Sequence, residues 1–249
     1  TVMELCGVSK SNSSVDSAML EYCIREDLKM SQPRMMAVLD PVKLVIDNYE
    51  EGKIEYLDVP NNQENPELGT RKVPFGRELY IEREDFKIDP PRKYFRLFPG
   101  NEVRLMSAYF VTCTGYETDE DGNVTVVHAT YDPETKSGSG FTGRKVKGTI
   151  HWVSATEGSP VEVRLYENIV DEEKGVYNEE DGSINVNPHS LTVLKNCYVE
   201  PELLKAQPED KFQFVRNGYF TADSKDSEAG KPVFNRIVSL KSSFKMPAK

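Results

Sequence analysis

S-Q-P-R-M-M-A-V-L-D-P-V-K-L-V-I (Ser31–Ile46) is the stretch at which the chain changes from a helical pattern to strand and turn patterns. Pro33 ends the helix, because a proline disfavours helical backbone at the residue before it. The apolar and β-branched run that follows is broken at Asp40-Pro41, which predicts an interrupted strand. Arg34 places a charge at the edge of this apolar run. Such a charge is either solvated at the start of a strand or directed at a ligand.

An amphipathic helix is predicted before this stretch, from Ser14 to about Lys29. Its apolar residues recur near helical spacing, at Val15, Ala18, Met19, Tyr22 and Cys23. Ser14 is the expected N-cap, and Asp16 places a negative charge in the first turn.

Short strand patterns separated by turns occupy the rest of the chain. Residues 145–153 alternate most regularly, with Val146, Ile150 and Trp152 on one face and His151 among the lysines of the other. Further strand patterns lie at 78–83, 102–112, 123–131, 160–166, 191–198, 212–220 and 234–240, with hairpin signals at 120–123 and at Asn217-Gly218. Short strands at this spacing favour a barrel or a sandwich.

Composition limits the class of protein. The 249 residues suffice for one large domain or two ordinary ones, with no apolar run of about 18 residues and no signal-peptide pattern. Thr1 in place of an initiator Met suggests a fragment. Four scattered cysteines indicate reduced thiols. The net charge of -10 argues against nonspecific binding of polyanions, yet Lys87–Arg104 carries five basic residues against two acids. Charge alone favours random surface variation over an RNA-binding face as the explanation of this uneven charge distribution.

Catalytic and metal-binding motifs are absent from the sequence. His128 and His151 have no nucleophile motif nearby, so a structural or surface role is favoured for both. The loop S-G-S-G-F-T-G-R-K has Arg144 where a phosphate loop needs lysine, and it leads into a strand. Because no catalytic residue or metal ligand set emerges, the chain by itself does not look like a complete enzyme. The interleaved basic and aromatic residues of Arg92–Arg96 favour a binding function instead, because such side chains stack on unpaired bases.

Several long motifs resemble the glutaminyl-tRNA synthetase family. They are C-I-R-E-D-L (23–28), P-R-M-M-A-V-L-D-P-V-K-L-V-I (33–46), G-R-K-V-K-G-T-I-H-W-V (143–153), V-R-L-Y (163–166), F-Q-F-V-R-N-G-Y-F (212–220) and K-P-V-F-N-R-I-V-S-L (231–240). The resemblance runs from end to end, but only with the C-terminal anticodon-binding region of that family.

The resemblance implies a mostly β fold with two ribosomal L25-like β-barrels after a short helical segment. The expected domains are a helical connector (1–32), a discontinuous proximal barrel (33–98 and 196–249) and a distal barrel (99–195). ATP and Mg would belong to a catalytic domain that is absent here, so no cofactor is expected in this chain. The expected partner is tRNA(Gln), without DNA or a membrane, and the protein is expected to be a cytoplasmic monomer.

The resemblance also implies which side chains meet the anticodon, whose last two bases are U and G. Arg34 and Gln213 match positions that read the middle U, and Arg216 a nearby RNA contact. Arg96 matches the position that reads the final G, and Arg104 one near the first base. An arginine fork suits guanine acceptors, and a glutamine amide suits a uracil edge.

Departures from the family pattern concern the first anticodon base. Lys93 stands where Gln is often found, and Phe95 and Met106 stand where well-known members carry a basic side chain. Glu64 occupies a position expected to be Asn, with Asn65 adjacent. Lys93, Phe95 and Asn65 are therefore further possible RNA contacts. The alternatives are the anticodon-binding part of a non-bacterial-type glutamyl-tRNA synthetase, or an L25-like barrel with a structural or protein-binding role.

Overall fold

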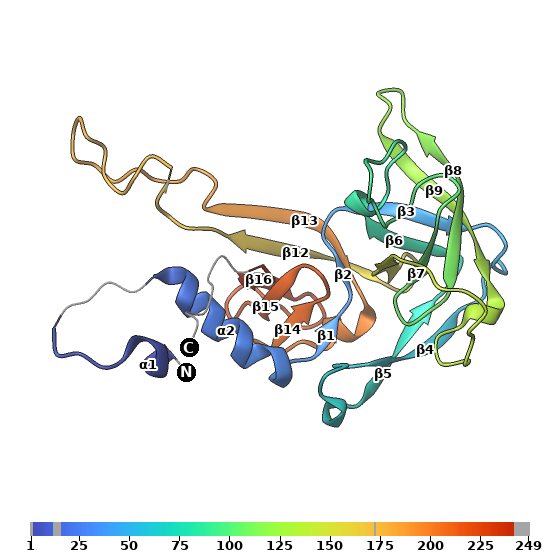
Figure 1. Ribbon diagram of the computed structural model, residues 1–249, viewed down its shortest axis with the longest axis horizontal. Helices are drawn as coiled ribbons and strands as arrows, with labels where there is room; N and C mark the ends of the chain where they lie inside the picture. The colour runs from blue at the N-terminus through green and yellow to red at the C-terminus, as the bar shows by residue number, and fades with distance from the viewer. Residues whose placement is uncertain (1, 12–15, 172, 242–249) are drawn as a thin grey trace.

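The computed structural model describes residues 2–11, 16–171 and 173–241. Strands hold 40% of the described residues and helices 14%, and the strands form two barrel-like sheets behind a short helical segment (Figure 1). The expected mostly β fold is therefore confirmed.

Two helices begin the chain, α1 (Val2–Cys6) and α2 (Ser17–Ser31). The N-cap of α2 is Asp16, whose carboxylate accepts a hydrogen bond from the Ala18 N–H at 2.8 Å. The helix thus begins three residues later than we expected, and Ser14 lies outside the described residues. Leu28 of α2 packs on Tyr219 and Val238, which attaches the helix to the first of the two sheets.

The first sheet has seven strands. Their order is β1 (Arg34–Met35), β14 (Lys211–Phe214), β15 (Gly218–Ala222), β16 (Val233–Ser239), β12 (Ser159–Tyr166), β13 (Leu191–Val199) and β2 (Ala37–Val38). The two end strands, β1 and β2, are separated by Met36 alone. One short segment therefore pairs with both ends of the sheet and closes it.

The second sheet closes in the same way. Its order is β10 (Thr149–Ile150), β7 (Glu102–Leu105), β8 (Phe110–Thr118), β9 (Val124–Asp132), β3 (Pro41–Ile46), β6 (Glu78–Glu82) and β11 (Val153–Ser154), and β4 (Glu55–Pro60) with β5 (Thr70–Phe75) makes a separate hairpin. Only His151 and Trp152 lie between the end strands β10 and β11. Trp152 is fully buried, and its indole N–H donates to the Met106 carbonyl at 2.9 Å.

The expected strand over 145–153 is wrong in its extent. Residues 136–148 form a loop, and the chain is paired only at β10 and β11. Because the segment changes its partner strand between Ile150 and Val153, the alternation of faces stops there. His151 is consequently buried, at 1% exposure, rather than sharing a face with the lysines.

The sheets divide the chain at other places than the expected domain limits. β3 and β6, expected in the proximal barrel, pair in the second sheet with β9, whereas β12 and β13, expected in the distal barrel, pair in the first sheet with β16 and β2. The chain crosses between the sheets at Leu39-Asp40, directly before Pro41. Both amide groups there donate to the carboxylate of Glu82, at 2.9 and 3.0 Å, so the crossing leaves no backbone donor unpaired.

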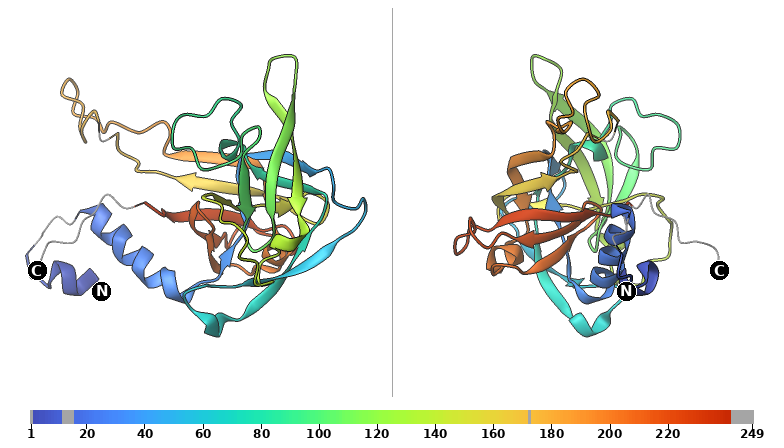
Figure 2. Two further views of the ribbon diagram at one scale, coloured as in Figure 1. Left: turned by 45° about the vertical axis from the view of Figure 1, so that its right-hand side comes forward. Right: turned by 90° about the vertical axis from the view of Figure 1, so that its left-hand side faces the viewer.

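The β12–β13 ribbon extends well past the other strands of the first sheet (Figures 1 and 2). The two strands pair from Ser159↔Val199 to Tyr166↔Leu191. Two main apolar clusters, one for each sheet, make the core. The candidate site lies where the two sheets meet.

Candidate nucleic-acid interface

Arg34 and Gln213 face each other across two paired strands. β1 and β14 are parallel, with Arg34 opposite Gln213 in the register. The Gln213 N–H donates to the Pro33 carbonyl and the Val215 N–H to the Met35 carbonyl, both at 2.9 Å. Residues that lie opposite in a pleated sheet project from the same face. The pairing therefore brings together two residues that are 179 positions apart in the sequence.

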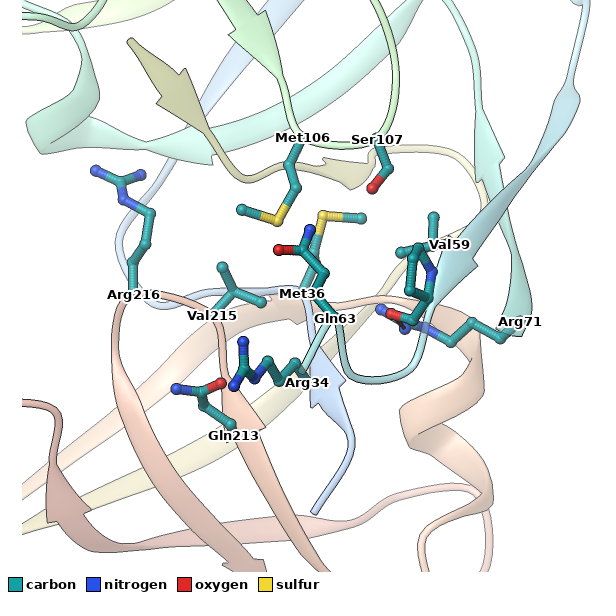
Figure 3. Close-up of a pocket in the computed structure, with 11 residues that line it drawn as sticks. Arg34, Met36, Val59, Gln63, Arg71, Met106, Ser107, Gln213, Val215 and Arg216 are labelled. Carbon is teal, nitrogen blue, oxygen red and sulfur yellow. Dashed lines mark hydrogen bonds between the residues drawn. The ribbon is translucent and has the colours of Figure 1, made fainter. Parts of the chain in front are cut away.

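A small cavity opens beside this pair (Figure 3). It has a volume of about 180 Å³, and we call it the first cavity. Its apolar lining includes Met36, Val59, Met106 and Val215, and its polar lining includes Arg34, Gln63, Gln213 and Arg216. An apolar wall with donors and acceptors at its rim is suited to a flat ring whose edge is read by hydrogen bonds.

The guanidinium of Arg34 is paired with a carboxylate. Arg34 Nη2 lies 3.0 Å from Glu64 Oε1, and Lys29 Nζ lies 3.2 Å from Glu64 Oε2. Hydrogen bonds from Arg34 and Lys29 hold the pKa of the Glu64 carboxyl below its usual value. Arg34 Nε is buried without a hydrogen-bond partner among the described residues, so the arginine keeps an unused donor.

Arg216 lies between the first cavity and a second one. It occupies the hairpin loop between β14 and β15, where Phe214 pairs with Gly218. The predicted hairpin is present, but the residue with left-handed backbone is Arg216, at φ 66°, because the loop has three residues instead of two. The second cavity, of about 450 Å³, lies between the two sheets and is lined by both Arg216 and Arg96.

A buried carboxylate joins these two arginines. Asp85 belongs to the short helix η2 (Arg83–Asp85), and its side chain is 1% exposed. Arg216 donates to it with both terminal nitrogens, at 2.6 and 2.7 Å, and Arg96 Nε lies 3.2 Å from Oδ1. Burial lowers the pKa of Arg216, but the hydrogen bonds and charge of Asp85 outweigh burial and raise it. The arginine is therefore fixed in its charged form.

His151 and Glu82 extend this network. His151 Nδ1 lies 3.3 Å from Arg216 Nη1, and its Nε2 lies 3.2 Å from Glu82 Oε1. Asn217 donates to the same Glu82 oxygen at 3.1 Å. Burial raises the pKa of Glu82, but the hydrogen bond and charge of His151 overcome it, and the pKa is lowered overall. Asp85, Glu82 and His151 were not expected at the site, and no local signal distinguishes the two acids from Glu84 between them.

Lys93 and Phe95 line a third, more open hollow of about 540 Å³ together with Arg96. Phe95 is 48% exposed, and Lys147 Nζ lies 5.5 Å from the centre of its ring. Burial and the charge of Asp85 raise the pKa of Tyr94 in the same hollow to about 12, which keeps its phenol neutral. An exposed ring beside cationic groups is a typical surface for stacking on a base.

Two other expected contacts have their side chains occupied. Arg104 on β7 donates to Ser137 Oγ at 2.8 Å and stacks on the Phe110 ring at 4.3 Å. Burial lowers the pKa of Arg104. Asn65 caps η1 (Pro66–Leu68) by accepting from the Glu67 N–H, and its amide donates to the Met30 carbonyl at 2.8 Å. Neither residue lines any of the three cavities.

Residues 2–11, 16–171 and 173–241 contain no group of three or more His, Cys, Asp or Glu side chains that could hold a metal ion. In the same part of the chain, no helix is long and apolar enough to cross a membrane.

Two family models match the chain. Both are described as tRNA synthetases class I (E and Q), anti-codon binding domain, and they cover residues 32–132 and 149–223. Together they include more than half of the sequence, among it β1, η2 and the β14–β15 hairpin.

Curated relatives match over nearly the whole chain. A glutamine–tRNA ligase of Clostridium perfringens is 56% identical over 244 residues, which are 96% of this chain and 43% of the relative. A glutamine–tRNA ligase of Clostridioides difficile is 56% identical over 240 residues, again 96% and 43%. One of Cupriavidus metallidurans is 52% identical over 243 residues, 96% and 41%. The chain thus spans less than half the length of these relatives.

Proposed function

This chain belongs to the anticodon-binding domains of the class I tRNA synthetases for glutamate and glutamine, and from that premise we propose that it binds tRNA(Gln) and reads its anticodon. It would do so as the C-terminal part of a glutamine–tRNA ligase, a cytoplasmic enzyme that attaches glutamine to tRNA with ATP. ATP and Mg would bind in the portion of the relatives that this chain does not span. Without that portion the chain would bind RNA but form no aminoacyl-tRNA.

The Arg34–Gln213 register beside the first cavity is the observation that carries the proposal. We assign the middle U to these two residues, since a uracil edge offers both an acceptor and a donor and Gln213 can match both. The orphaned Arg34 Nε supplies a further donor. Arg216, which lines the same cavity, is assigned to a neighbouring RNA contact.

The final G is assigned to Arg96, whose planar fork suits the two acceptors of guanine. Phe95 and Lys93 lie in the same hollow, and we propose that Phe95 stacks on a base while Lys93 contacts the RNA backbone. Arg104 is assigned to the first base. It lies two residues before Met106, which lines the first cavity. Asn65 is left out of the proposed contacts, because both ends of its amide are already bonded.

Binding of anticodon stem-loops tests this function directly. A stem-loop with U in the middle and G at the end should bind more tightly than one with the middle U replaced by C. The expected loss is about 1–3 kcal/mol, the usual cost of one mismatched specific base. Salt must be held constant, because phosphate contacts make all nucleic-acid affinities depend on it. Equal binding of the two stem-loops would refute anticodon reading.

Matched protein variants test whether Arg34 provides the preference for the middle U. Arg34→Ala should abolish the preference for the middle U while the melting temperature stays close to that of the wild type, since the ion pair that is lost involves the exposed carboxylate of Glu64. Lys72→Ala is the control, because it also removes one cation, and its Asp58 partner is far in the sequence from every assigned residue.

Glutamate-specific recognition is the second candidate, because both family models are described for E and Q together. A stem-loop from tRNA(Glu) should bind more weakly than that from tRNA(Gln) if the glutamine assignment is correct. Charging of both tRNAs by the intact parent enzyme decides between the two amino acids.

A further inference from the structure

Asp85 connects the residues assigned to two different bases. Resting on the function proposed above, we propose that Asp85 is a positioning residue shared by Arg216 and Arg96. Through it, recognition of the middle base depends on recognition of the final base, and the reverse. Asp85 itself would touch no RNA, because its side chain is 1% exposed.

One carboxylate oxygen of Asp85 contacts both arginines. Asp85 Oδ1 accepts from Arg216 Nη2 at 2.7 Å and lies 3.2 Å from Arg96 Nε, while Oδ2 accepts from Arg216 Nη1 at 2.6 Å. Because both guanidinium groups use this oxygen, a shift of the carboxylate toward one of them lengthens its contact with the other. A base that pulls on either arginine therefore changes the position of its neighbour.

The backbone of η2 fixes the same relationship. The Leu97 N–H donates to the Asp85 carbonyl at 2.9 Å, and Phe86 and Leu97 form an isolated β-bridge. Arg96 is thus tied to Asp85 through its side chain and, one residue later, through its backbone. A displacement of Asp85 would move the whole loop that carries Arg96 and Phe95.

On the other side, Asp85 fixes the side chain of Arg216, whose left-handed backbone is set by the three-residue hairpin loop. Left-handed backbone is unfavourable for a long side chain and persists where the surroundings impose it. The two parallel bonds to Asp85 fix the direction of the guanidinium at the end of that side chain. Without the carboxylate, two half-buried guanidinium groups would face each other with His151 as the nearest remaining partner of Arg216, and both would be expected to turn away.

Arg216 also gives the coupling a physical path. It lines the first cavity with Arg34 and Gln213, and the second cavity with Arg96 and Asp85. Two sites that share one movable side chain have a coupling free energy, and this coupling acts equally in both directions. Sequence proximity plays no part, since Asp85 and Arg216 are 131 positions apart.

The test measures four anticodon stem-loops against the chain: the matching one, one with the middle U replaced, one with the final G replaced, and one with both replaced. The wild type should discriminate at both positions. Asp85→Asn, which keeps the shape and removes the charge, should reduce discrimination at both positions by about tenfold. Glu55→Gln is the control: Glu55 on β4 also holds two tyrosines and a lysine, but it contacts no assigned residue.

The results of this experiment distinguish a failure of anticodon reading from a failure of the coupling alone. A wild type that binds all four stem-loops equally would refute anticodon reading and the coupling together. A wild type that discriminates, beside an Asp85→Asn variant that loses discrimination at one base or at neither, would overturn the coupling alone.

Arg96→Ala keeps the inference testable if Asp85→Asn does not fold. Arg96 is 40% exposed, so its removal should leave the fold intact, as a thermal unfolding curve would verify. This variant should lose its preference for G at the final position. Its discrimination at the middle base should also fall by about three- to tenfold, although Arg96 lines no part of the first cavity. Unchanged discrimination at the middle base would overturn the shared role of Asp85.

Discussion

Arg34 is not freely solvated, because one terminal nitrogen of its guanidinium is paired with Glu64. The two oxygens of Glu64 are divided between Arg34 and Lys29. An RNA that uses Arg34 must displace this carboxylate and tolerate its charge near the phosphates. Glu64 therefore competes with the proposed ligand at the level of a single side chain.

Glu64→Gln should consequently raise the affinity for the matching stem-loop. The expected gain is about two- to tenfold, because one repulsive charge is removed and an arginine is released. Titration of the stem-loop at fixed salt measures it. Glu67→Gln is the control, since it removes a carboxylate from the same loop that pairs with neither Arg34 nor Lys29. Weaker binding by Glu64→Gln would show that Glu64 positions Arg34 for the RNA instead of competing with it.

At the scale of elements, two short segments carry both the closure of the sheets and the placement of the site. β1–β2 brings Arg34 to Gln213, and β10–β11 follows a loop that contacts the loop of residues 87–98. The contact is closest at Gly148, where an added Cβ would collide with the Phe95 carbonyl oxygen. Gly148 also accepts the Arg104 N–H at 2.9 Å. The glycine is required here by space, and its position determines where Phe95 and Arg96 lie.

Gly148→Ala should therefore disturb stability and RNA binding together. A collision with backbone cannot be relieved by a side-chain rotation, so a loss of about 2 kcal/mol in the free energy of unfolding is expected. Preference for the final G should fall in parallel, because Arg96 adjoins the displaced backbone. Gly115→Ala on β8 is the matched control, since nothing lies within 4 Å of its added Cβ. Urea unfolding and stem-loop titration give the two values, and a Gly148→Ala variant as stable as Gly115→Ala would contradict the argument.

At the scale of the molecule, buried ion pairs join parts that belong to different sheets. Besides Asp85–Arg216, the Arg71 guanidinium on β5 pairs with Glu200, which lies at the end of β13 before η4 (Pro201–Lys205). The two side chains are 5% and 1% exposed. Glu200 also accepts the Met36 N–H at 2.8 Å, so one carboxylate connects the β4–β5 hairpin to the segment that closes the first sheet.

Glu200→Gln should lower the free energy of unfolding by about 3 kcal/mol, because it leaves a buried guanidinium without a counter-charge. Asp58→Asn breaks the exposed Lys72–Asp58 pair on the same hairpin and should cost less than about 1 kcal/mol. Chemical unfolding of both variants compares the two pairs. Equal costs would mean that water reaches Arg71 and that the hairpin is not held by this contact.

Features that depend on neighbouring residues could be predicted from the sequence, whereas features that depend on contacts between distant residues could not. The α2 helix, the Asp40-Pro41 break and the hairpin at Asn217 follow from local chemistry and were expected. The extent of the strand over 145–153 was not predicted correctly. His151 and Trp152 are buried because the segment changes its partner strand there, and an alternating sequence pattern does not reveal such a change. The division of strands between the two sheets does not follow from local chemistry either, since pairing of β3 with β9 joins residues about 80 positions apart.

By itself, the sequence determined the mostly β class, the helix-to-strand change within Ser31–Ile46 and the motifs of an anticodon-binding family. Those features depend on the period of apolar residues, on proline geometry and on residue identity along the chain. Only the tertiary structure decided that Arg34 lies opposite Gln213, that Glu64 occupies Arg34, and that Asp85 joins Arg216 to Arg96. These are contacts between distant segments, and their partners are selected by sheet closure and by the need of buried charges for counter-charges, neither of which leaves a local pattern.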